Sequence, residues 1–123
     1  MGTAIGIAIA GALGALARYA VDGWISGRTG GFPWGTFVVN VTGAFLLGFL
    51  FTVLTERVRM SPALRTSITV GFLGAYTTFS TWMFESARLA EDGELQQATL
   101  NVAGSLALGL VIAAAGYGVG SLW

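Results

Sequence analysis

Long uncharged runs alternate along the chain with short charged segments. The four runs cover most of the sequence: Met1–Ala17, Thr29–Thr55, Thr66–Phe84 and Leu95–Trp123. A transmembrane helix needs about 20 predominantly apolar residues, and the first run reaches this length by continuing through Arg18. The pattern therefore predicts an all-α membrane protein, a single domain over residues 1–123 with four transmembrane helices at about 3–22, 34–55, 63–89 and 95–117.

The composition agrees with a membrane protein and excludes several functional classes. Charged residues make up 10% of the chain and hydrophobic residues 54%, against about 25% charged residues in soluble domains. Six arginines balance six acidic residues, so no net field attracts nucleic acid. Without His or Cys the chain has almost no ligand set for zinc or a transition metal. With no nucleophile–base pair either, we expect no enzyme activity.

The third run contains a polar cluster near its centre, from Gly74 to Trp82. Lipid offers no partner to hydroxyl groups or to a loosened backbone, so this cluster must face protein or water. A glycine there allows the helix to open, and the freed carbonyl groups can bind a hard cation, as in the broken helices of transporters. We interpret the cluster as the working site of an ion pathway, in a third helix that is broken at mid-membrane.

The arginines give no preferred orientation in the membrane. The predicted spans place Arg57, Arg59 and Arg65 on the side of both termini, and Arg18, Arg28 and Arg88 on the other side. Cytoplasmic loops normally carry the excess of positive charge, so an even split allows insertion in both directions. Two opposite copies would then pair about a two-fold axis, where residues meet their own counterparts. Chance also divides six arginines evenly in many sequences. The hypothesis of two opposite copies therefore depends on its agreement with the position of the mid-membrane cluster.

The first helix has small residues at four-residue spacing, which favours close packing against another helix. They are Gly2, Gly6, Ala10 and Gly14. Near its end, Arg18 precedes Asp22 by one turn, so the two side chains are placed to pair. Arg18 is either an interfacial anchor or part of a vestibule or interface.

Two asparagines lie within the uncharged runs. Asn40, in the second helix, has two alternative roles, as a packing contact between helices or as a pore residue whose amide donates hydrogen bonds. Asn101 lies one turn before Ser105 on the same face of the fourth helix.

Three longer strings of residues match a known pattern. They are GALGALARY at Gly11–Tyr19, GTFVVNVTG at Gly35–Gly43 and GFLGAYTTFST at Gly71–Thr81. With the segment from Asn101 to Ser105 the likeness covers essentially the whole chain. The chain resembles the CrcB/Fluc fluoride channel family.

This resemblance implies a passive, fluoride-selective channel that exports cytoplasmic fluoride and confers fluoride resistance. It implies a multi-pass protein of the cell (inner) membrane, and a dual-topology antiparallel dimer of two copies, or of one copy and a paralogue, with two pores. A structural sodium ion would be held by the backbone carbonyls of Gly74 and Thr77 from both subunits. The fluoride pore would be lined by a further set: Asn40, Phe79, Ser80, Thr81, Trp82 and Ser105.

One position departs from the family pattern. The second aromatic of the Thr-Thr-Phe-Ser-Thr-Phe string is usually Phe, and here it is Trp82. An indole is larger than a phenyl ring and adds an N–H donor.

Two other functions fit the length of the chain. A small dual-topology, proton-coupled multidrug-type transporter needs an intramembrane carboxylate, but Glu85 lies well past the centre of the third helix and the first two have none at mid-depth. A purely structural membrane protein leaves the mid-helix cluster unexplained.

Overall fold

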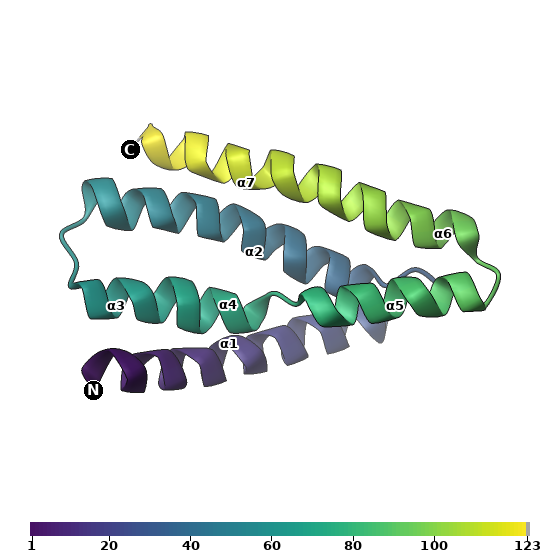
Figure 1. Cartoon of the computed structure of the whole chain (residues 1–123), viewed down its shortest axis with the longest axis horizontal. Helices are drawn as coiled ribbons and strands as arrows, with labels where there is room; N and C mark the ends of the chain where they lie inside the picture. Colours follow the sequence, from purple (N-terminus) through teal and green to yellow (C-terminus); the bar gives the residue numbers. More distant parts are fainter. Residues whose placement is uncertain (123) are drawn as a thin grey trace.

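The residues that the structure describes form a bundle of four helical rods, and rods that follow each other in the chain run antiparallel (Figure 1). The computed structural model describes residues 1–122. The first rod is α1 (Gly2–Ser26), and the second is α2 (Trp34–Thr52), which continues as a π-helical turn, η1 (Val53–Arg57). The third combines α3 (Pro62–Thr66), η2 (Ser67–Leu73), α4 (Gly74–Tyr76) and α5 (Phe79–Glu91). The fourth combines α6 (Leu95–Thr99), η3 (Leu100–Gly104) and α7 (Ser105–Ser121).

The rods run up and down, so the chain has two distinct ends. Both termini and the connection from α2 to α3 lie at one end, and the other two connections lie at the opposite end (Figure 1). Ser61 begins the third rod by accepting a hydrogen bond from the Leu64 N–H at 3.2 Å, with Pro62 as the first helical residue. Proline suits this position because the N–H that it lacks has no helical partner there.

Three rods are continuous helices long and apolar enough to cross a membrane: Gly2–Ser26, Trp34–Arg57 and Leu95–Ser121. At about 1.5 Å per residue, each exceeds the roughly 30 Å of a bilayer core. The predicted all-helical membrane architecture is confirmed, and the residues that the structure describes contain no β-strand. The third rod is not continuous, because the helical conformation is interrupted after Tyr76.

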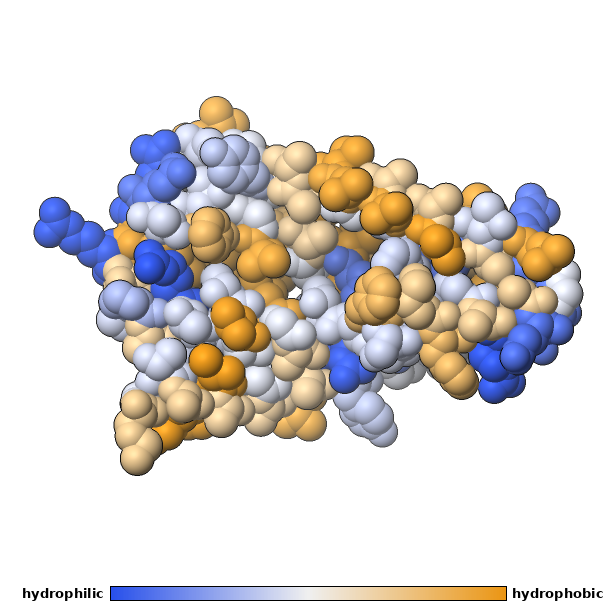
Figure 2. Space-filling view, viewed as in Figure 1, coloured by the Kyte–Doolittle hydropathy of each residue, from blue (hydrophilic) through white to orange (hydrophobic). Residues whose placement is uncertain are grey.

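The surface of the single chain is apolar over most of its length. Figure 2 shows hydrophobic residues across the middle of the molecule and hydrophilic residues mostly at its two ends. Large side chains such as Ile9, Leu110 and Val111 are more than half exposed, whereas Val39 and Leu73 belong to a small buried core. This distribution is expected for helices whose outer faces contact lipid.

Glycines let the rods approach closely. A Cβ atom on Gly14 of α1 would overlap the backbone carbonyl of Phe72 in η2, and one on Gly6 would meet Ser67. Between α2 and α7, a Cβ atom on Gly48 would overlap the Ala113 carbonyl, and one on Gly116 the Phe45 carbonyl. The predicted close packing of the first helix is therefore confirmed at Gly6 and Gly14, whereas a Cβ atom on Gly2 would meet no described atom of another segment within 4 Å.

Candidate functional site

The interruption of the third rod consists of two extended residues. Thr77 has φ −87° and ψ 157°, and Thr78 has φ −148° and ψ 117°. The Thr78 hydroxyl caps α5 by accepting from the Thr81 N–H at 3.3 Å. Threonine favours such positions because its hydroxyl offers the backbone an alternative to helical hydrogen bonds. The Gly74–Trp82 cluster thus spans the end of α4, the extended pair and the start of α5.

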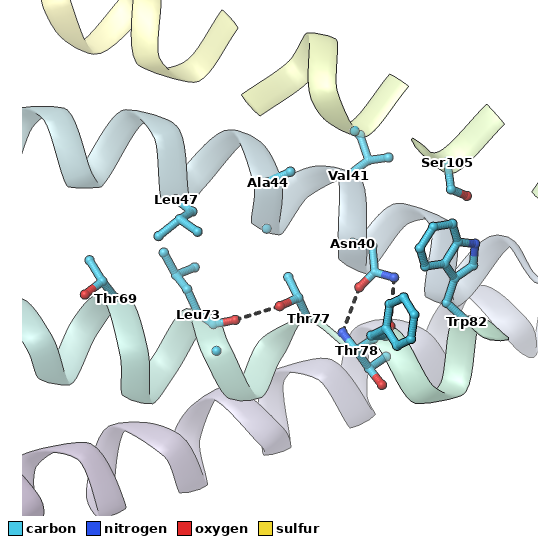
Figure 3. A pocket seen from close by; sticks show the side chains of 14 residues that line it. Asn40, Val41, Ala44, Leu47, Thr69, Leu73, Thr77, Thr78, Trp82 and Ser105 are labelled. Atoms are coloured by element: carbon cyan, nitrogen blue, oxygen red, sulfur yellow. Dashed lines mark hydrogen bonds between the residues drawn. The ribbon is translucent and has the colours of Figure 1, made fainter. Parts of the chain in front are cut away.

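Asn40 joins α2 to this interruption by two hydrogen bonds. Its Nδ2 donates to the carbonyl oxygen of Thr78 at 3.0 Å, and its Oδ1 accepts from the Thr78 N–H at 2.8 Å (Figure 3). A side-chain amide has the same donor and acceptor as a peptide, so Asn40 pairs with Thr78 as a neighbouring strand would. The second N–H of its NH₂ group remains to serve another partner.

The backbone carbonyls from Gly74 to Thr77 lose their helical donors at the interruption, and for the first and the last of them the structure shows where the donor goes. In a continuous α-helix, the Thr78 N–H would bond to the oxygen of Gly74, and the Thr81 N–H to that of Thr77. Here the Thr78 N–H donates to Asn40 and the Thr81 N–H to the Thr78 hydroxyl. The carbonyl oxygens of Gly74 and Thr77 are thus two of the backbone acceptors that the interruption separates from their helical donors.

Arg18 of α1 also contacts the third rod. Its Nε donates to the carbonyl oxygen of Ala75 at 3.2 Å. The predicted pairing with Asp22 is not among the contacts of the described residues, where Asp22 instead accepts from the Ser26 hydroxyl at 3.1 Å. A guanidinium group beside the last carbonyls of α4 satisfies an acceptor that the end of the helix leaves without a donor.

A groove of about 350 Å³ opens beside the interruption. Its lining comes from α2, η2, α4, α5 and α7: Asn40, Val41, Gly43, Ala44, Leu47, Thr69, Leu73, Gly74, Thr77, Thr78, Phe79, Trp82, Ser105 and Gly109. Figure 3 shows Asn40, Thr78, Trp82 and Ser105 close together, although they come from three rods. We call this cavity the groove.

The groove gathers six of the nine residues that the sequence singled out: Asn40, Gly74, Thr77, Phe79, Trp82 and Ser105. Ser80, Thr81 and Arg18 are not part of its lining. Ser80 is exposed on the surface of the chain, and the Thr81 hydroxyl accepts from the Thr78 hydroxyl at 3.2 Å.

Two aromatic rings stand at one end of the groove. The centroids of Phe79 and Trp82 are 5.7 Å apart and their planes meet at 84°, an edge-to-face pair. Edge-to-face geometry places the positive rim of one ring against the negative face of the other. Phe79 is 70% exposed in the single chain, which is unusual for a large aromatic that lines a cavity.

Trp82 also belongs to a buried hydrogen-bond network that the sequence did not reveal. Its indole Nε1 donates to the carbonyl oxygen of Asn101 at 2.9 Å, and the Asn101 Nδ2 donates to the Ser86 hydroxyl at 2.8 Å. Ser86 in turn donates to the carbonyl oxygen of Trp82 at 2.8 Å, and Ser105 donates to Asn101 Oδ1 at 3.5 Å. The one-turn spacing of Asn101 and Ser105 was a signal in the sequence, but it did not connect either residue to Trp82 or to Ser86.

The fold and the site together define a class of protein. Interrupted helices occur at membrane depth only where they are buried in protein or line a cavity, and there they form sites for ions and small solutes. The chain is a multi-pass membrane protein with such an interruption beside a groove.

Comparison with known proteins shows the family. The family model described as "CrcB-like protein, Camphor Resistance (CrcB)" matches residues 5–117, and the chain belongs to this family. A protein of Acidobacterium capsulatum named "Fluoride-specific ion channel FluC" is 51% identical over 116 residues, which cover 94% of this chain and 93% of the relative. Proteins with the same name from Geotalea daltonii and Geobacter sulfurreducens are 49% and 48% identical, covering 95% and 90% of this chain and 99% and 90% of the relatives. The resemblance seen in the sequence is confirmed, and these names are those of ion channels, not of enzymes.

Proposed function

We propose that the chain is a passive, fluoride-selective ion channel. The observation that carries this proposal is the groove, where the Asn40 amide, the Ser105 hydroxyl and the Phe79–Trp82 ring pair meet beside a helix interruption. Relatives about half identical over nearly their whole length have the name of fluoride channels. No carboxylate is among the lining residues, which disfavours the alternative of a proton-coupled multidrug-type transporter.

A groove of this kind suits a small anion. An unpaired ion in an apolar medium costs tens of kcal/mol by a Born estimate, so a pore must replace the water that it removes. The Asn40 amide has a second N–H besides the one that Thr78 accepts, and the Ser105 hydroxyl can donate when it rotates away from Asn101. Neither group holds the anion by a full opposite charge. Conduction needs this compromise between entry and release. The rims of Phe79 and Trp82 add partial positive charge.

The working channel in this proposal is an antiparallel dimer with two pores. The groove is open to the outside in the single chain, and Phe79, which lines it, is strongly exposed. A second copy inserted in the opposite direction, or a paralogue, would cover both. The even distribution of arginines between the two ends agrees with insertion in both directions.

A structural sodium ion at the dimer axis completes the proposal. The carbonyls of Gly74 and Thr77 from both copies would hold it at mid-membrane, since their helical donors are engaged by Asn40 and by the Thr78 hydroxyl. The ion would fix the two interruptions against each other. In the cell (inner) membrane such a channel lets cytoplasmic fluoride leave and so confers fluoride resistance.

The test is ion efflux from liposomes that contain purified protein. We expect fluoride to leave under an imposed gradient far faster than chloride, with a potential that follows the fluoride gradient alone. The protein must first be shown to be folded and dimeric by size-exclusion chromatography. A folded dimer that releases no fluoride would rule out the proposed function.

A further inference from the structure

The hydrogen bonds around Trp82 form a closed ring. The path leads from the indole Nε1 to the Asn101 carbonyl, from the Asn101 amide to the Ser86 hydroxyl, and from Ser86 back to the Trp82 carbonyl. Asn101 is 0% exposed and Ser86 is 6% exposed, so water does not compete for these groups. In such surroundings a hydrogen bond is electrostatically stronger than in water, and leaving one partner unpaired is costly.

This cycle of hydrogen bonds links α5 to the π-helical segment η3, which contains Asn101. The Asn101 carbonyl accepts both from the Ser105 backbone N–H and from the indole. Ser105 lies four residues after Asn101, so this carbonyl keeps its α-helical donor and accepts the indole N–H as a second one. It fixes one end of the indole, while Ser86 bonds to the backbone carbonyl of Trp82 at the other end.

This arrangement decides which part of Trp82 faces the groove. The one N–H donor of the indole is engaged by Asn101, so it does not serve as a donor to an ion in the groove. What the side chain contributes there is the ring itself, held at 84° to the ring of Phe79. A phenyl ring at the same position has no N–H and therefore no bond to Asn101.

We propose that Ser86 and Asn101 are positioning residues, which act through the indole of Trp82 to hold the aromatic wall of the anion path in its edge-to-face arrangement. This inference rests on the proposed channel function. Ser86 and Asn101 do not line the groove. Ser86 acts on the lining through Trp82, and Asn101 acts through Trp82 and also through Ser105, from whose hydroxyl it accepts. The effect of losing Ser86 therefore depends on whether residue 82 has the indole N–H that bonds to Asn101.

The experiment is a double-mutant cycle in liposomes with Trp82→Phe, Ser86→Ala and the two together. Ser86→Ala lowers fluoride efflux about three- to tenfold in the chain with Trp82, because the Asn101 amide loses its buried partner. In the Trp82→Phe background the same substitution has a clearly smaller effect, since the Asn101 amide still loses its partner but no indole remains to be positioned. Ser86→Thr keeps the hydroxyl and restores the flux.

Ser67→Ala is the matched control. Ser67 is 6% exposed, like Ser86, and its hydroxyl also bonds to the carbonyl four residues before it, at 2.7 Å. It lies outside the groove and away from Trp82, and its loss leaves fluoride efflux unchanged in both backgrounds. If Ser86→Ala does not fold, Ser86→Cys, whose thiol is a weaker donor, replaces it in the cycle.

Fluorescence separates this inference from the proposed function. In a chain whose other tryptophans, Trp24, Trp34 and Trp123, are replaced by Phe, Ser86→Ala lowers the anisotropy of Trp82, and Ser67→Ala does not. Equal losses of flux in both backgrounds, or an unchanged anisotropy, would overturn the positioning role. Absence of fluoride efflux from the unaltered protein would instead contradict the channel function, and the anisotropy would still decide whether the indole is held.

Discussion

The contact between α2 and α7 differs sharply from the groove that opens between the same two helices and α5. In the contact, which we call the glycine seam, Gly48 and Gly116 face the Ala113 and Phe45 carbonyls so closely that a single added carbon has no room. At the groove, the Asn40 side chain joins α2 to the third rod, and about 350 Å³ of space remains. The same two helices are thus closely packed along the glycine seam and line a cavity elsewhere.

The difference shows how small and large residues share the work in a membrane protein. Within lipid, helices associate by close packing and hydrogen bonds and not by the hydrophobic effect, so glycine brings backbones together. Around the groove the helices carry larger side chains, those of Asn40, Phe79 and Trp82. Asn40 bonds to the backbone of the third rod, and the two aromatic rings contact each other edge to face. The seam stabilises the bundle, and the groove is left for an ion.

The largest expected effect comes from filling the seam. Gly116→Leu should prevent folding or destabilise the chain by about 3 kcal/mol or more, because overpacking against a backbone carbonyl cannot be relieved by a side-chain rotation. Gly118→Leu, on the same helix with no atom within 4 Å of the added carbon, is the matched control and should fold. Yield of monodisperse protein and its melting temperature measure both. Equal behaviour of the two variants would show that the seam is not close-packed.

Asn40→Ala should remove the side-chain contact between α2 and the interruption of the third rod. Two hydrogen bonds to Thr78 are lost at once, and each buried group left unpaired costs about 1–3 kcal/mol. We expect fluoride efflux from liposomes to fall about a hundredfold, while Gln96→Ala, an exposed amide at the start of the fourth rod, leaves it unchanged. Normal flux in Asn40→Ala would mean that the interruption holds its shape without the amide.

Phe79→Ile should lower fluoride efflux about tenfold without dissociating the dimer. The edge-to-face contact with Trp82 is lost, and such a pair contributes about 0.5–1.5 kcal/mol beyond its buried area. Phe84→Ile is the control, since Phe84 is 63% exposed on the same helix, close to the 70% of Phe79, and does not line the groove. Unchanged flux in Phe79→Ile would remove this ring from the anion path.

Sodium should have the smallest effect, seen in stability. If the Gly74 and Thr77 carbonyls hold the ion, replacing sodium by a large organic cation lowers the melting temperature of the dimer. The reason is that a ligand bound by the folded state and not by the unfolded state stabilises the folded state. Thr77→Val should keep this sodium dependence, because the proposed ligand is the carbonyl and the Thr77 hydroxyl already donates to Leu73 at 3.1 Å. A melting temperature independent of sodium would argue against the site.

Much of the fold followed from the order of apolar and charged residues. The uncharged runs predicted the four rods, and their ends differ from the observed ones by a few residues, as for α1, which continues to Ser26. Glycine spacing predicted the close contact of Gly6 and Gly14 with the third rod. These features are local, since hydropathy, small size and length act within one segment whatever its neighbours are.

The amino-acid sequence was enough to predict a helical membrane protein of the CrcB-like family and to single out the residues of the polar cluster. The contacts of those residues came from the folded structure. That Asn40 pairs with the backbone of Thr78, that Arg18 donates to Ala75 and not to Asp22, and that Trp82 is tied through Asn101 to Ser86 depend on how separate rods meet. A hydrogen bond needs its two atoms within about 3 Å of each other, and no one-dimensional pattern specifies distances between helices.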